Sequence, residues 1–189
     1  GINRLCFTGS VPTAGVIAAA AAPNIVPLSF ELGGKSPLLV LDDADMDLAV
    51  DIAVEQFDNA GQVCLKGARL LVDAKIADEF TQRVHDKART LKQGDPRATD
   101  TMIGAQASKE QHDKIRSYFD IGRGEGAEVL TGGDVADLGG ELSSGYYIKP
   151  TIFRGSNKMR VFQEEIFGPV LSVATFKDYD EAIEIANTT

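Results

Sequence analysis

Residues 37–72 of this 189-residue chain read PLLVLDDADMDLAVDIAVEQFDNAGQVCLKGARLLV. The apolar run Leu38–Leu41 predicts a short buried strand. The aspartates of Asp42–Asp45 then favour a helix over Met46–Phe57, because carboxylates at a helix start meet unpaired N–H groups and the positive end of the helix dipole. The turn Asn59–Gly61 ends this helix, and Ala68–Val72 predicts the next strand. The stretch therefore indicates a strand–helix–strand unit.

The same alternation continues on both sides of this stretch. Upstream, a strand-like opening precedes a helical run over Ala14–Ala22, which Pro23 ends. Downstream, apolar residues recur every three or four positions over Ile76–Leu91 and predict an amphipathic helix. The remaining elements expected are a helix over Lys109–Ile121, strands at Val129–Leu130, Tyr146–Phe153 and Val170–Phe176, and a helix over Asp180–Ala186. Such alternation predicts an α/β layered fold with a largely parallel sheet.

Composition narrows the class of protein. Hydrophobic residues make up 43% of the chain and charged residues 25%, which are the proportions of a globular protein and exclude overall disorder. The net charge of -9 disfavours nucleic acid or an anionic membrane as the main partner. The most apolar stretch, Ala14–Ala22, is far shorter than the roughly 20 residues that span a bilayer. We therefore expect a cytoplasmic protein with no membrane partner.

The two cysteines suggest neither a disulfide framework nor a metal site. Cys6 and Cys64 form no CxxC pattern, and the two histidines are isolated, so no metal is expected. Cys64 lies between a predicted helix and a predicted strand, where loops often carry functional groups. The alternative is a small buried hydrophobic residue. Cys6 lies inside a predicted strand and is expected in the core, which leaves Cys64 as the expected reactive thiol. His85 and His112 are expected on helix surfaces.

Three further segments carry candidate functional groups. Glu31 lies between apolar residues and the flexible pair Gly33–Gly34, and apolar surroundings would suit it to proton transfer; a capping or pairing carboxylate is the alternative. Phe7–Ser10 follows a strand and precedes a helix, where free N–H groups can bind phosphate, although the frequency of glycine in turns favours a plain tight turn. Glu164–Pro169 puts paired acids before a Gly-Pro turn, which an acidic loop end would also explain. The glycine-rich stretch Gly122–Gly126 is expected to be a loop.

Four segments together occur in the order and spacing of the aldehyde dehydrogenase superfamily, which this chain resembles: Phe7–Ser10, Glu31–Pro37, Gly61–Cys64 and Glu164–Val170. The resemblance spans essentially the whole chain. The resemblance implies a three-layer α/β/α fold with a largely parallel sheet, of the aldehyde-dehydrogenase catalytic-domain type. Residues 1–33 would be the end of the dinucleotide-binding domain. Residues 34–189 would be the thiol-bearing catalytic domain, truncated at its C-terminal side.

The resemblance also implies a reaction, the NAD(P)-dependent oxidation of an aldehyde to a carboxylic acid. Cys64 would attack the small-molecule aldehyde to give a thiohemiacetal and then a thioester, and Glu31 would activate the water that hydrolyses it. The cofactor would be NAD, with NADP as the alternative, and the full-length protein would be a homo-oligomer. Six positions would face the cofactor: Gly9 and Ser10 at the pyrophosphate, Leu32 and Gly33 at the nicotinamide through their backbone, Glu165 at the nicotinamide ribose, and Phe167 near the nicotinamide.

The sequence departs from the family pattern in three places. Ala14, followed by Gly15, stands where many relatives have a second glycine. The resemblance implies that an oxyanion-stabilising asparagine, together with the lysine and acid that select NAD or NADP, lies upstream of Gly1, and that the segment completing an oligomerisation strand lies beyond the other end. This chain alone is therefore expected to be nearly inactive. Two other functions stay open: an isolated folding or dimerisation module of such an enzyme, and a thiol hydrolase or esterase that uses Cys64 without a cofactor.

Overall fold

The computed structural model describes all residues, 1–189. They form two compact units, Gly1–Gly34 and Lys35–Thr189, and each is described by itself. The roles expected for residues 1–33 and 34–189 stay predictions, because the compactness of a unit does not tell what it binds.

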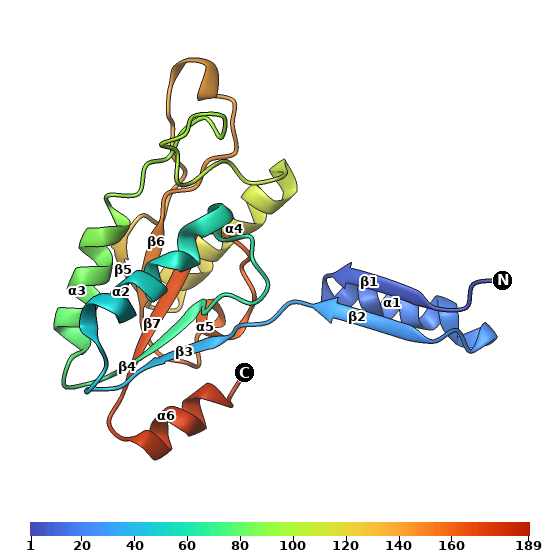
Figure 1. Cartoon of the computed structure of the whole chain (residues 1–189), viewed down its shortest axis with the longest axis horizontal. Coiled ribbons are helices and arrows are strands. Elements are labelled where there is room, and N and C mark those ends of the chain that lie inside the picture. The colour runs from blue at the N-terminus through green and yellow to red at the C-terminus, as the bar shows by residue number, and fades with distance from the viewer. The chain divides into compact units, whose positions relative to one another are not determined.

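The smaller unit is a strand–helix–strand motif (Figure 1). Its elements are β1 (Leu5–Gly9), α1 (Val11–Ala21), the 3₁₀ turn η1 (Ala22–Asn24) and β2 (Leu28–Leu32). The two strands are parallel. Helix α1 begins three residues before the predicted Ala14, because Ser10 caps it and a proline occupies its first turn.

The larger unit is built on a five-stranded sheet in the order β3-β4-β7-β6-β5. The strands are β3 (Pro37–Val40), β4 (Arg69–Asp73), β5 (Glu128–Thr131), β6 (Thr151–Arg154) and β7 (Val170–Phe176). Only β5 is antiparallel to its neighbour. The strand predicted over Tyr146–Phe153 begins only at Thr151, because Pro150 lacks the N–H group that regular pairing requires.

Helices cover both faces of this sheet. They are α2 (Met46–Val54), α3 (Ala77–Ala88), α4 (Lys109–Gly124), α5 (Arg160–Gln163) and α6 (Tyr179–Ala186), with 3₁₀ turns η2 (Glu55–Gly61) and η3 (Gly140–Leu142). On β4, Leu70 and Val72 pack into a core with α2 and α3, whereas Leu71 packs into a second core with α4, α5 and α6. Because successive side chains of a strand face opposite sides, these two cores are the two faces of the sheet. The predicted three-layer α/β/α fold is confirmed. None of the helices combines the length and apolar composition that would let it span a membrane.

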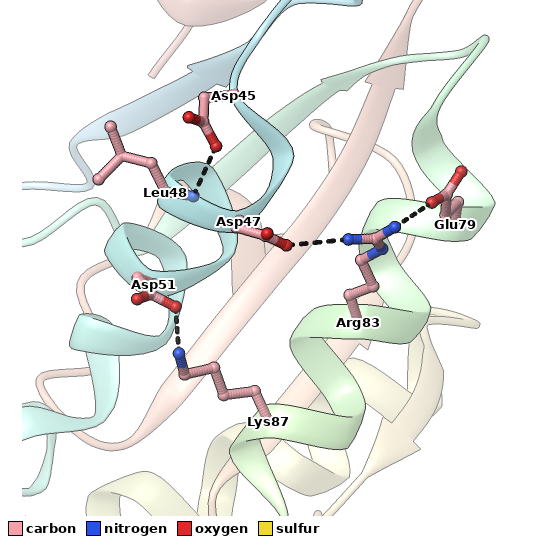
Figure 2. Close-up of polar contacts among 7 residues, drawn as sticks. All are labelled: Asp45, Asp47, Leu48, Asp51, Glu79, Arg83 and Lys87. Atoms are coloured by element: carbon pink, nitrogen blue, oxygen red, sulfur yellow. Dashed lines mark hydrogen bonds and ion pairs between the residues drawn. The ribbon is translucent and has the colours of Figure 1, made fainter.

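Helices α2 and α3 lie side by side on one face and are joined by exposed charges (Figure 2). The Nη1 and Nη2 atoms of Arg83 donate to Asp47 at 3.0 Å and to Glu79 at 2.6 Å. Figure 2 also shows the Lys87–Asp51 ion pair and the cap at which Asp45 accepts the Leu48 N–H. Exposed ion pairs contribute at most about 1 kcal/mol each, so the apolar core carries most of the stability of this layer.

The expected loop at Gly122–Gly126 is wrong in its first half, because α4 continues to Gly124. A Cβ atom on Gly122 would lie 2.9 Å from the Cε1 atom of Phe153, and both residues are buried. The missing side chain lets the end of the helix approach the sheet closely. The glycine here is a packing residue inside a helix and does not mark a turn.

Candidate active site

The carboxyl ends of β1 and β2 bring three of the predicted cofactor residues together. Gly9 and Leu32 are register partners, and Gly33 follows directly. The chain then enters α1 through Ser10, whose Oγ accepts the Thr13 N–H at 3.4 Å and shares a 2.8 Å hydrogen bond with the Thr13 hydroxyl. Two strand ends beside a helix N-terminus form the kind of edge at which α/β folds bind phosphate groups.

Glu31 lies on β2 opposite Thr8, and its side chain is exposed. The prediction that Glu31 lies in apolar surroundings is therefore wrong within this unit. Alternation along the strand explains the difference, because Phe30 and Leu32 face the other side of the ribbon. There the Phe30 ring meets the Phe7 ring edge-on, with centroids 6.3 Å apart. Glu31 is a solvent-facing carboxylate.

Cys6 shares the face of Glu31 and is also exposed, so its prediction as a core residue is wrong. The cause is the same, because a two-stranded ribbon in this unit leaves one of its faces open. The thiols of Cys6 and Cys64 are both free and exposed. Accessibility alone therefore does not separate the two thiols in this chain.

Cys64 lies on the loop between η2 and β4, as predicted. The residues before it form a tight turn in which Asn59 and Ala60 adopt left-handed conformations, with φ of 51° and 55°. The Asn59 and Gln62 side chains donate to each other's backbone carbonyls at 3.1 and 3.3 Å. The Gln62 Oε1 atom also accepts the Ala107 N–H at 3.1 Å. This turn fixes the chain just before the cysteine.

A close backbone contact joins the Cys64 loop to the segment Glu164–Pro169. Gly61 has φ of 70°, and a Cβ atom placed on it would lie 1.9 Å from the carbonyl oxygen of Gly168. The Gln56 amide also reaches this carbonyl, with Nε2 at 3.5 Å. Two segments that the sequence singled out separately, more than 100 residues apart, are thus packed against each other within one unit.

The paired acids of this segment are in different environments. The Glu164 carboxylate accepts the Tyr118 hydroxyl at 2.7 Å and the Nε and Nη2 atoms of Arg160 at 2.7 and 2.9 Å. The bond from Arg160 lowers the pKa of Glu164, while burial, together with this carboxylate, raises the pKa of Tyr118 to about 12. The Glu165 carboxylate accepts no hydrogen bond from the protein and is half-buried. Glu164 holds the segment in place, and Glu165 is available to a ligand.

Phe167 has a left-handed backbone, with φ of 59°, and is held there by helix α4. The Gln111 Nε2 group donates to the carbonyls of Ile166 and Phe167, both at 2.8 Å. Ile115 packs so closely on Gly168 that a Cβ atom there would lie 2.4 Å from Cδ1. Sequence reasoning missed Gln111 and Tyr118. Their signal was the spacing of four and three residues around Ile115, which puts all three on one helix face.

Lys35 belongs to the segment Glu31–Pro37, and no local pattern predicts a role for it. Its side chain is buried, and its Nζ atom has no hydrogen-bond partner. Burial and the charge of Arg69 lower the pKa of Lys35 to about 7, whereas the charge of Glu165 opposes the shift.

The histidines lie on α3 and α4, as predicted, and are partly buried. His85 Nδ1 lies 3.1 Å from the neighbouring Asp86 carboxylate, and His112 Nδ1 lies 3.4 Å from that of Asp113. The structure has no group of three or more histidine, cysteine or acidic residues placed to hold a metal ion.

Comparisons with known proteins agree on one family. The family model described as "Aldehyde dehydrogenase family" matches residues 1–189. A curated aldehyde dehydrogenase of Paracoccus denitrificans is 56% identical over 194 residues, which cover 100% of this chain and 38% of that protein. The solved structure of HpcC from Thermus thermophilus has a TM-score of 0.96 at 41% identity, over 99% of this chain and 37% of that one. A betaine aldehyde dehydrogenase from Staphylococcus aureus in complex with NAD+ has a TM-score of 0.95 at 40% identity, over 98% of this chain and 37% of that one. The chain thus spans less than two fifths of these relatives.

Proposed function

Because the chain belongs to the aldehyde dehydrogenase family over its whole length, we propose that it is part of an enzyme that oxidises an aldehyde to a carboxylic acid with NAD. NADP is the alternative cofactor. The observation that carries the proposal is the packing of the Cys64 loop on the segment Glu164–Pro169 through Gly61 and Gly168. This contact brings the segment of an exposed thiol, Cys64, against the segment of a half-buried carboxylate, Glu165.

In the proposed reaction, the thiolate of Cys64 attacks the aldehyde carbon and forms a C–S bond, and the carbonyl oxygen takes up a proton. The thiohemiacetal carbon then loses a hydride, for which bound NAD would supply the acceptor, and its hydroxyl loses a proton to solvent, so that a thioester remains on Cys64. Glu31 then accepts a proton from water as the water attacks the thioester carbon. The C–S bond breaks, the carboxylic acid leaves, and the thiol is regenerated. The exposed carboxylate of Glu31 and the exposed thiol of Cys64 suit these roles.

The residues of the smaller unit fit a dinucleotide. Gly9 and Ser10 would face the pyrophosphate, because they join a strand end to the N-terminus of α1. Leu32 and Gly33 would approach the nicotinamide through their backbone at the same strand edge. Ala14, which replaces the glycine of many relatives, is buried in α1. Its N–H donates to the Ser10 carbonyl at 3.0 Å and stays within the helix.

The larger unit supplies the remaining contacts. Glu165 would accept hydrogen bonds from the nicotinamide ribose, which its free carboxylate supports, and Phe167 would pack near the nicotinamide ring. The hydrogen bond from Gln111 to the Phe167 carbonyl holds this left-handed backbone, which supports the proposed role of Phe167. The proposal also includes a homo-oligomeric full-length protein in the cytoplasm and a small-molecule aldehyde as substrate.

The test uses a full-length polypeptide that contains this chain, with NAD, NADP and a panel of aldehydes. We expect NAD(P)H formation that Cys64→Ala abolishes and Cys6→Ala preserves. Loss of activity in Cys6→Ala alone would contradict the assignment of Cys64. Ester hydrolysis that needs Cys64 but neither cofactor nor Glu31 would favour the thiol hydrolase.

A second candidate, a folding or dimerisation module without a complete site, is favoured by the short span of the chain, 38% of the Paracoccus relative. A titration of the 189-residue chain with NAD separates the two. If residues outside the chain complete the site, we expect weak or absent NAD binding and turnover at least about 100-fold below that of the full-length protein. The loss of one oxyanion donor alone reduces the catalytic rate about 100- to 1000-fold. Turnover within tenfold of the full-length protein would show that those residues are dispensable.

A further inference from the structure

Gln106 is a buried polar residue in the loop that leads into α4, and it contacts the turn before Cys64. The residue keeps only 4% of its accessible surface. Its Nε2 group donates to the carbonyl of Ala60 at 3.1 Å, whereas its Oε1 atom accepts no hydrogen bond. Its backbone N–H donates to the Tyr146 carbonyl at 2.8 Å, which holds the residue from a second side. The buried amide of Gln106 therefore acts on the Ala60 carbonyl alone.

The turn at Ala60 has an unusual backbone. Asn59, Ala60 and Gly61 have φ of 51°, 55° and 70°, so three consecutive residues are left-handed. A Cβ atom makes this conformation unfavourable, and it persists where the surrounding structure holds it. Asn59 and Gln62 bond each other across the turn. Gln106 adds a contact from outside it, 46 residues away in the chain.

The next residue, Ala107, holds the same turn. Its N–H donates to the Gln62 Oε1 atom at 3.1 Å. Only Val63 separates Gln62 from Cys64, and the Lys66 N–H closes a turn around the cysteine by donating to the Val63 carbonyl at 3.3 Å. A movement at Gln62 therefore reaches the thiol through a single residue.

Two other side chains of the larger unit hold distant backbone carbonyls. The Nε2 group of Gln93 donates to the Ile148 carbonyl at 2.7 Å. Arg69 is fully buried, and its Nη1 and Nη2 atoms donate to the carbonyls of Ile185 and Ala186 at 2.8 and 2.7 Å. None of these carbonyls belongs to a segment of the candidate active site. Gln93 thus makes the same kind of hydrogen bond as Gln106 in a different place.

We propose that Gln106 is a positioning residue for the Cys64 thiol: its amide, together with the neighbouring N–H of Ala107, holds the left-handed turn from which the chain enters the cysteine loop. The catalytic part of the inference rests on the proposed function, in which Cys64 attacks the aldehyde. In this role Gln106 acts through the backbone of the turn. Its loss should slow the attack and leave NAD binding almost unchanged, since small errors in the placement of a reacting atom reduce the rate strongly.

Hydrogen exchange and burst kinetics of the full-length enzyme test this role. Gln106→Met keeps the length of the side chain and removes the N–H donor, and Gln93→Met is the matched control. We expect Gln106→Met to speed exchange of the Gln62 and Lys66 amides at least about tenfold, because the turn opens more often. It should also slow the pre-steady-state burst of NADH about tenfold, with NAD affinity changed less than about threefold. The control should stay within about twofold of the wild type in all three measurements.

The other side of the contact decides the matter if Gln106→Met does not fold. Gln62→Glu keeps an oxygen that can accept the Ala107 N–H, whereas Gln62→Leu does not. The burst should stay within about threefold of the wild type in Gln62→Glu and fall about tenfold in Gln62→Leu, and equal bursts in these two variants would overturn the inference.

Unchanged exchange of the Gln62 and Lys66 amides in Gln106→Met would also overturn the inference. So would a loss of NAD affinity as large as the loss of the burst, because Gln106 would then support the whole site and not the thiol. Absence of NADH formation in the wild type would instead refute the proposed function, and the exchange rates would still decide whether Gln106 holds the turn.

Discussion

Replacing Gly61 by alanine tests the contact that joins the Cys64 loop to Gly168. The new Cβ atom would lie 1.9 Å from the Gly168 oxygen, 2.0 Å from its carbon and 2.5 Å from the Pro169 nitrogen, all of which are backbone atoms. A left-handed φ costs alanine roughly 1–2 kcal/mol, and forcing atoms into a packed region costs about 1–3 kcal/mol more. We therefore expect Gly61→Ala to lower the free energy of unfolding by about 2–5 kcal/mol. Urea denaturation followed by far-UV circular dichroism measures it.

Two other glycines separate these contributions. Gly126 has φ of 85°, and a Cβ atom added to it would have no neighbour within 4 Å, so Gly126→Ala should show the conformational cost alone, about 1–2 kcal/mol. Gly124 has neither a left-handed φ nor a close neighbour, and Gly124→Ala in α4 should be neutral or stabilising by up to about 1 kcal/mol. If Gly61→Ala costs no more than Gly126→Ala, the close approach to Gly168 contributes nothing and the reasoning fails.

In the full-length enzyme, Glu31→Gln should keep a burst of NADH but slow the steady state, since the amide cannot accept a proton from water; equal loss of both phases would place its role before hydride transfer. Tyr118→Phe should lower the free energy of unfolding by about 1 kcal/mol at pH 7, because one bond to the Glu164 carboxylate is lost. The pKa of Glu164 is lowered in the folded state, so this stabilisation is present at neutral pH and disappears as acid protonates the carboxylate. If Tyr118→Phe lowers the free energy of unfolding by the same amount in acid as at pH 7, this reasoning is contradicted. Excess iodoacetamide should add two labels to the native 189-residue chain, at Cys6 and Cys64, and a single label would contradict the exposure of both.

The layered fold followed from the sequence because its signals are local. Strand β7 has the predicted bounds, Val170–Phe176, since a run of apolar and β-branched residues leaves little choice of structure. Helix α4 begins at Lys109, as predicted, behind a capping Ser108 whose Oγ accepts the Gln111 N–H. Signals of this kind depend only on residues within a few positions.

The environments of individual side chains did not follow, because they depend on distant segments. Cys6 and Glu31 lie in a strand pattern typical of a core, yet the open face of a two-stranded ribbon exposes both. Lys35 lies between glycine and serine in a segment with no apolar pattern, yet its side chain is buried. The different environments of Glu164 and Glu165 depend on Tyr118, 46 residues away. A sequence pattern locates such groups but does not reveal what surrounds them.

The hydrogen bonds of Arg69 have a consequence for the order of folding. Helix α6 ends without a glycine, and the carbonyls of Ile185 and Ala186 are satisfied by a guanidinium 116 and 117 residues earlier in the chain. An eight-residue helix is marginal on its own in water, so its last turn is only weakly held by local hydrogen bonds before β4 is in place. In pulsed hydrogen exchange during refolding, the amides of α6 should become protected only after those of β4, although the helix is local in sequence.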